Sequence, residues 1–177
     1  MRLLPTFEEV QNDIVKVSEN IPYVFIHKPT LHFLIIYNNT VIRFATIYTK
    51  GNAGYDVLLE TFGCVCFRAY VHRILAHLFV QNPRPDIFDR VDHIDRNEKN
   101  NQTYNLRWLT RQLNMLNSSA EGCTFNNIRK RWVARLRKNG RQVQLGAFKT
   151  FLEGHRVYRA RREELFNEIY KKHIDEG

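Results

Sequence analysis

The sequence contains few cysteines and no long apolar run. Only three of its 177 residues are cysteines: Cys64 and Cys66 stand two positions apart, and Cys123 is distant. A C-x-C pair is not the C-x₂-C pair of a zinc site, so we expect small buried side chains here rather than metal ligands. No segment approaches the roughly 18 apolar residues of a membrane span, and residues 1–5 do not begin a signal peptide. These absences favour a cytoplasmic protein that does not contact a membrane.

Acidic side chains are scarce in one long segment. The chain has 27 lysine and arginine residues against 18 aspartate and glutamate residues, a formal net charge of +9. Residues 123–151 contain no acidic residue and eight basic ones. A basic excess of this size indicates a polyanionic partner, most often a nucleic acid. We therefore predict that double-stranded DNA contacts the last third of the chain.

The predicted fold class is α+β, in segments that differ in periodicity. Residues 1–62 are expected to form a helix, from Thr6 to about Ser18, and then a small antiparallel sheet. They carry no catalytic signature, and an unidentified protein partner for them stays open. The other predicted domains are residues 63–117, a linker at residues 118–122, and residues 123–177, in which three strands pack on one helix.

A polar stretch in the second predicted domain contains the residues that point to chemistry. Its pattern predicts a strand at residues 91–94, a second strand at residues 106–109, and a helix that Thr110 caps. The first strand carries Asp92 and His93, and the helix carries Asn114. A two-stranded ribbon followed by a short helix would bring these side chains together.

The residue types in this stretch suit phosphodiester hydrolysis. Histidine can act as a base near neutral pH, so His93 is the candidate that activates a water. Asp92 and Asn114 offer oxygen atoms, which Mg²⁺ and Mn²⁺ prefer as ligands. Because neighbouring residues of a regular strand point to opposite faces, Asp92 and His93 can serve one phosphate only if the strand bends or ends there.

These motifs, in this order, resemble the HNH homing endonucleases of phages and their introns. The resemblance extends over roughly residues 51–117 and implies a ββα-metal unit. It also implies that His93 is the general base, that Asp92 and Asn114 hold one divalent metal ion, and that Asn105 orients His93 and ties the loop between the strands. The segments that carry it are Val71–Val80, Asp92-His93-Ile94-Asp95, Asn100-Asn101, Asn105-Leu106-Arg107-Trp108 and Asn114.

The basic last third alternates as strands do. Its predicted strands are residues 124–130, 132–138 and 142–148, and a helix is predicted at residues 151–172. Alternation places apolar side chains, including Trp132, on one face and basic or amide side chains on the other. Arginine suits guanine edges, and glutamine suits adenine edges, in the major groove of DNA. The residues predicted to contact DNA are Arg131, Arg135, Arg137, Gln142 and Gln144.

The segment from Arg131 to Thr150 is similar to the DNA-binding domain of plant ethylene-response factors, the Apetala-type domain. That resemblance implies three strands packed on one helix, with the sheet in the major groove. The sequence departs from the plant pattern at Asn126-Asn127, where the plant domain has basic residues in its first strand. This departure leaves the contacts of the first strand and the base preference open.

The leading hypothesis is a metal-dependent, site-directed DNA endonuclease of the homing type, which nicks one strand by a one-metal mechanism with Mg²⁺ or Mn²⁺. If a phage encodes it, the host cytoplasm is its expected location. The alternatives are a sequence-selective DNA-binding protein, or a phage interaction protein, in which the HNH fold is inactive.

Overall fold

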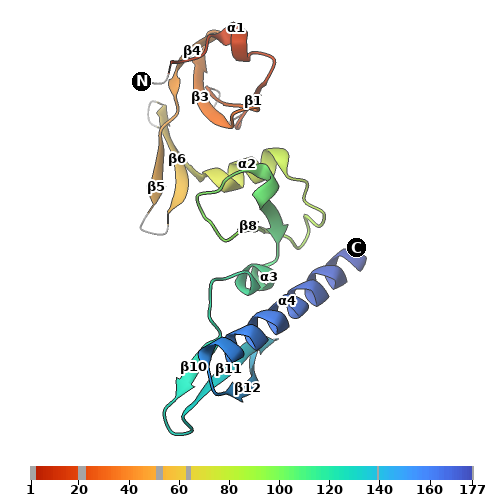
Figure 1. The fold of residues 1–177 in the computed structure, drawn as a ribbon. Helices are drawn as coiled ribbons and strands as arrows, with labels where there is room; N and C mark the ends of the chain where they lie inside the picture. Colours follow the sequence, from red (N-terminus) through yellow and green to blue (C-terminus); the bar gives the residue numbers. More distant parts are fainter. Residues whose placement is uncertain (1–2, 20–22, 51–53, 63–64, 139, 177) are drawn as a thin grey trace. The chain divides into compact units, whose positions relative to one another are not determined.

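The computed structural model describes residues 3–19, 23–50, 54–62, 65–138 and 140–176. It has the predicted α+β composition, with several small antiparallel sheets and a long C-terminal helix (Figure 1). None of the helices in the described ranges is long and apolar enough to cross a membrane. The chain divides into two compact units, Met1–Gln81 with Asn97–Arg107, and Asn82–Arg96 with Trp108–Gly177.

The first unit opens with a short helix and a four-stranded sheet. Helix α1 (Phe7–Val10) has the predicted capping box on Thr6, but it ends long before Ser18. The prediction was wrong after Val10, because Ile14–Lys16 pairs with a later strand, an interaction that a local pattern does not reveal. The sheet is antiparallel in the order β1 (Ile14–Lys16), β2 (Val24–His27), β3 (His32–Tyr37) and β4 (Thr40–Phe44).

A second sheet of the first unit has the order β5 (Ile47–Lys50), β6 (Tyr55–Phe62) and β7 (Val65–Tyr70), and helix α2 (Val71–Phe79) follows it. A buried carboxylate joins this sheet to the first. Glu60 accepts hydrogen bonds from Arg43 on β4 and from the Thr46 backbone amide. Burial alone would raise the pKa of Glu60, but these hydrogen bonds outweigh it and hold the pKa below its ordinary value.

One cysteine in this sheet differs from expectation. Cys66 is exposed, because it lies at the hairpin end of β6 and β7, where it pairs with Thr61. Cys64 lies outside the described residues. Cys123 is buried as expected, and burial raises the pKa of its thiol.

The second unit contains most of the predicted ribbon and its helix, followed by the basic sheet, whereas Leu106 and Arg107 of the ribbon are assigned to the first unit. Strands β8 (Arg90–His93) and β9 (Leu106–Leu109) form a two-stranded sheet, and helix α3 (Arg111–Leu116) follows. The basic sheet has the order β10 (Cys123–Asn126), β11 (Arg131–Lys138) and β12 (Arg141–Phe148), and helix α4 (Phe151–Asp175) packs on it (Figure 1). The first of these strands stops at Asn126 instead of Lys130, because Asn126 accepts turn hydrogen bonds from the Ile128 and Arg129 amides.

The core of the second unit is shared between α3, the basic sheet and α4. Leu116 of α3 is buried with Ala134 and Leu136 of β11 and with Tyr158 and Leu165 of α4. A core shared in this way means that α3 cannot move independently of α4 without losing buried apolar contacts.

Residues 118–122, the predicted linker, are held along their length. The buried Arg162 of α4 donates to the Ser118 carbonyl at 2.7 Å. His155 donates to the Glu121 carbonyl at 2.9 Å, and the Arg135 amide donates to the Gly122 carbonyl at 2.9 Å. These bonds fix the path of the chain between α3 and β10.

Gly122→Ala should lower the free energy of unfolding. Gly122 has a φ of 69°, and an added Cβ would lie 2.2 Å from the Tyr158 ring. The left-handed backbone costs about 1–2 kcal/mol, and overpacking adds about 1–3 kcal/mol. Gly140→Ala is the matched control, because Gly140 has a φ of 76° with no atom within 4 Å of an added Cβ. Urea denaturation should show the larger loss for Gly122→Ala, and equal losses would contradict this packing.

Candidate functional site

Asp92 and His93 lie at the end of β8. Their predicted joint role requires the strand to bend or end at this point. The strand stops at His93, and a turn follows in which the Arg96 amide donates to the His93 carbonyl at 3.0 Å. Arg96 itself has a φ of 65°, an uncommon conformation for arginine. Asp92 is 7% exposed and His93 is 5% exposed. A buried carboxylate therefore stands beside a buried imidazole at a strand end.

Asn117 holds this strand end in place. Its side-chain amide donates to both carboxylate oxygens of Asp92, at 3.1 and 2.9 Å, and to the backbone carbonyl of His93 at 2.9 Å. The amide nitrogen has two hydrogens, so the two Asp92 oxygens share one and the His93 carbonyl takes the other. The Asn117 oxygen in turn accepts a bond from Nε of Arg96 at 3.1 Å. The hydrogens of the Asn117 amide thus hold Asp92 and His93, and its oxygen holds Arg96.

Sequence reasoning missed Asn117, although a signal for it exists. Residues three apart on a helix lie on the same side, and Asn117 follows Asn114 by three positions. It is also the residue that ends α3, with a φ of −87° and a ψ of 5°. Asparagine is so common where helices end that position alone did not distinguish a positioning role from an ordinary helix end.

Helix α3 carries Asn114 and is firmly anchored. The Thr110 hydroxyl accepts a bond from the Leu113 amide at 3.2 Å, as the predicted cap requires. Leu113 is fully buried and α3 packs on β8. The Asn114 side chain is half-buried and has no hydrogen-bond partner among the residues that the structure describes. Because the Asn114 amide is only half-buried, a ligand can reach it.

The donor atoms in this unit suit a hard divalent cation. Asp92 offers carboxylate oxygens from β8, and Asn114 offers an amide oxygen from α3, which leaves further coordination positions for water and phosphate. Within the described ranges, no group of three or more histidine, cysteine, aspartate or glutamate side chains is arranged to hold a metal ion. The candidate ligand pair fits Mg²⁺ or Mn²⁺ by the chemistry of its oxygen atoms.

Asn105 belongs to the first unit, where it ties a loop. It is 4% exposed, and its side-chain amide donates to the Asn100 carbonyl at 2.8 Å. The neighbouring Asn101 donates to Asp56 at 3.0 Å, which links the same loop to β6. The bond to Asn100 matches the loop-tying part of the predicted role, whereas the orientation of His93 by Asn105 stays a prediction.

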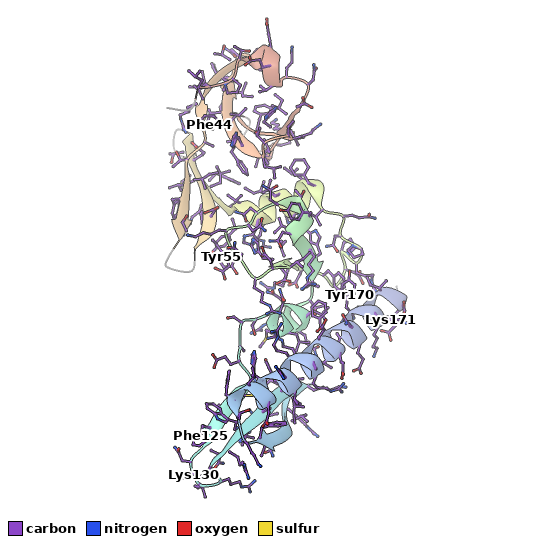
Figure 2. The ribbon with its side chains drawn as sticks, viewed as in Figure 1. Phe44, Tyr55, Phe125, Lys130, Tyr170 and Lys171 are labelled. Atoms are coloured by element: carbon purple, nitrogen blue, oxygen red, sulfur yellow. The ribbon has the colours of Figure 1, made fainter. Side chains whose placement is uncertain are left out.

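The residues predicted to contact DNA share one face of the basic sheet. Arg135 pairs across the strands with Gln144, and Arg137 pairs with Gln142, so all four side chains lie on the same side. The opposite side carries Ala134 and Leu136, which are buried against α4. Arg131, Arg137, Gln142 and Gln144 are exposed, and the half-buried Arg135 donates to the Thr124 hydroxyl at 2.9 Å. Figure 2 shows Phe125 and Lys130 at the β10–β11 end of this sheet.

The chain is similar in sequence to a viral HNH endonuclease. It is 32% identical over 124 residues to an uncharacterized HNH endonuclease of Acanthamoeba polyphaga mimivirus. The match covers 67% of this chain and 62% of the relative, so the chain spans less than two thirds of that protein's length. No protein-family profile matches the chain. The relative's name supports the sequence-based prediction of an HNH endonuclease.

A weaker likeness concerns a solved structure, which describes DNA binding and cleavage by the HNH homing endonuclease I-HmuI. The two chains are 24% identical, with a TM-score of 0.45, over 56% of this chain and 53% of the other. A likeness of this size supports no conclusion by itself. Neither similarity supports the resemblance of residues 123–177 to the ethylene-response-factor domain, which stays a prediction.

Asn117→Leu should destabilise the second unit. The substitution keeps the number and branching of the side-chain heavy atoms but removes the hydrogen bonds to Asp92 and to the His93 carbonyl, which leaves a buried carboxylate without these donors. We expect a loss of about 1–3 kcal/mol in the free energy of unfolding, measured by urea denaturation. Gln112→Leu, at an exposed position of the same helix, is the control. If both variants were equally stable, the bonds of Asn117 would not hold the site.

Proposed function

We propose that this protein is a metal-dependent endonuclease that hydrolyses phosphodiester bonds in double-stranded DNA. The observation that carries the proposal is the pairing of the buried Asp92 and His93 at the end of β8, both fixed by Asn117. The similarity to a protein named an HNH endonuclease supports it. A buried carboxylate is costly unless it has hydrogen-bond donors, and the Asn117 amide supplies donors to Asp92.

In the proposed mechanism, the imidazole of His93 accepts a proton from the water that attacks the phosphorus. Asn117 keeps the His93 backbone and the Asp92 carboxylate in fixed positions, so that neither must reorganise when substrate arrives. Asp92 and Asn114 would hold one Mg²⁺ or Mn²⁺ ion, which supplies positive charge for the phosphate and for the leaving 3′ oxygen. Asn105 would keep the loop that follows β8 in shape and orient His93.

Site selection is proposed to reside in the basic sheet. Arg131, Arg135, Arg137, Gln142 and Gln144 form a row of guanidinium and amide groups that can reach base edges when a sheet enters the major groove. The apolar side of the sheet is already used for packing on α4, so only this side is available to DNA. Since each chain would carry one catalytic site, the proposed product of a monomer is a nick, as in a homing-type enzyme.

His93→Ala should abolish cleavage of supercoiled plasmid DNA in Mg²⁺ or Mn²⁺, because no other group is proposed to take the proton of water. Loss of a general base typically costs about 10²–10⁴-fold in rate. His77→Ala, at an exposed histidine of α2, is the matched control and should cut at the wild-type rate. EDTA should stop the reaction of the wild-type protein. Equal rates for the two variants would show that His93 is not the base, whereas binding without cleavage by the wild type would favour a DNA-binding protein whose HNH fold is inactive.

Arg137→Ala should weaken DNA binding while leaving the fold intact, because Arg137 is an exposed member of the proposed DNA-binding face. A lost bidentate base contact costs about 1–3 kcal/mol and relaxes the base preference at one position. A phosphate contact would instead give a smaller loss, independent of sequence, with a shallower salt dependence. Fluorescence anisotropy at several salt concentrations separates these cases. Arg73→Ala, at an exposed position of α2, is the control, and an equal loss there would contradict a specific role for the sheet.

A further inference from the structure

The loop that leads into the candidate site is docked on the last turns of α4. Phe88, which is 1% exposed, stacks on Tyr170 at 5.8 Å between ring centroids and meets His173 edge-on at 6.1 Å. Arg84 donates to the His173 backbone carbonyl at 2.5 Å. Only Asp89 separates Phe88 from the first residue of β8, the strand that ends with Asp92 and His93. The position of the site is therefore coupled to the C-terminal end of α4.

Short-range hydrogen bonds also order the loop itself, so its contact with α4 fixes the position of β8. Asn82 donates to the Phe88 carbonyl at 2.9 Å and accepts from the Arg84 amide at 3.1 Å. Arg84 also pairs with Asp86 through two nitrogen atoms, at 3.0 and 2.8 Å. Bidentate guanidinium pairs fix orientation as well as distance.

The other parts of α4 hold the proposed recognition sheet and α3. The N-terminal part of the helix packs on β10, β11 and β12, and Arg162 near its middle binds the Ser118 carbonyl that follows α3. The helix has 25 residues, which makes it about 38 Å long. Figure 2 shows Tyr170 and Lys171 close to its C-terminal end, beyond the part that covers the sheet. One continuous helix thus contacts the basic sheet, the end of α3 and the loop before β8.

From these contacts we infer that Phe88 and Arg84 are specificity-determining residues: they dock the catalytic strand on α4, and α4 fixes which phosphate is cut relative to the bases that the sheet binds. The inference rests on the proposed nuclease function and deepens it. Modules joined by a flexible linker would sample many separations and cut at many positions. Helix α4 is anchored at both ends and near its middle, so the distance between the basic sheet and β8 is fixed. The cut therefore falls at a fixed number of nucleotides from the bases that the sheet binds.

The test is to weaken the contact between the loop before β8 and α4 without changing the proposed catalytic or DNA-binding residues. Because Phe88→Ala would leave a large cavity in the core, the variant of choice is the double substitution Tyr170→Ala with Arg84→Ala, which removes the ring stacked on Phe88 and the bond to His173. Lys171→Ala, at an exposed neighbouring position, is the matched control. The substrate is a DNA fragment selected from a randomised double-stranded pool by its binding to the wild-type protein, and its cut ends are mapped to single nucleotides in Mg²⁺.

The wild type and Lys171→Ala should cut at one phosphate. The double variant should bind the fragment with unchanged affinity and spread its cuts over several neighbouring phosphates. If the double variant cuts only at the wild-type phosphate, the inference is wrong.

A second measurement does not depend on cleavage. In ¹⁵N relaxation, the backbone amides of β8 should report the same rotational correlation time as those of β10–β12 in the wild type, and a shorter one in the double variant. The amides of α3 should not change, because Leu116 and Arg162 still hold that helix. Different times in the wild type would overturn the inference even if the protein proved to be a nuclease. If the wild type binds DNA but never cuts it, the proposed function fails and the assignment of the cut position fails with it, whereas the relaxation data still decide whether α4 makes these elements one rigid body.

Discussion

The candidate site depends on one side chain, the amide of Asn117. A carboxylate removed from water must be given donors, and Asp92 receives them from Asn117 at 3.1 and 2.9 Å. The same amide binds the carbonyl of His93, so the backbone that carries the proposed base is fixed by the group that satisfies the proposed metal ligand. Arg96 closes the arrangement by donating to the Asn117 oxygen. Through this one amide, the carboxylate of Asp92, the backbone of His93 and the guanidinium of Arg96 are held together.

Asn117 can hold Asp92 and His93 in place only if helix α3 is itself fixed. Leu113 is fully buried, and Leu116 belongs to the core that α3 shares with the basic sheet and α4. Arg162 and Gly122 then confine the chain that leaves α3, and the Phe88–Tyr170 stack confines the chain that enters β8. The packing that stabilises the second unit therefore also places the proposed chemistry and the proposed DNA-binding face in one body. Stability and cut position are linked in this account, because the same buried contacts serve both.

Much of the site could be predicted from the sequence, because its signals are local. The Asp92-His93 pair, the cap at Thr110 and the spacing to Asn114 need no knowledge of distant contacts, and the alternation of Arg135 and Arg137 predicts a face that the strand register confirms. The rest is non-local. Helix α1 is short because Ile14–Lys16 pairs with β2, and the dock of Phe88 on Tyr170 joins residues far apart in the chain. Asn117 was missed because an asparagine at a helix end is ordinary until its partners are known.

The most direct test of the central claim, a divalent metal site formed by Asp92 and Asn114, is an NMR titration of ¹⁵N-labelled protein with Mn²⁺. The unpaired electrons of the ion broaden the signals nearest to it first. The account predicts that the side-chain amide of Asn114 and the backbone amides of Asp92 and His93 broaden before any others, and that Asp92→Ala removes this effect. Broadening that begins elsewhere in the chain, or that survives in Asp92→Ala, would contradict the account.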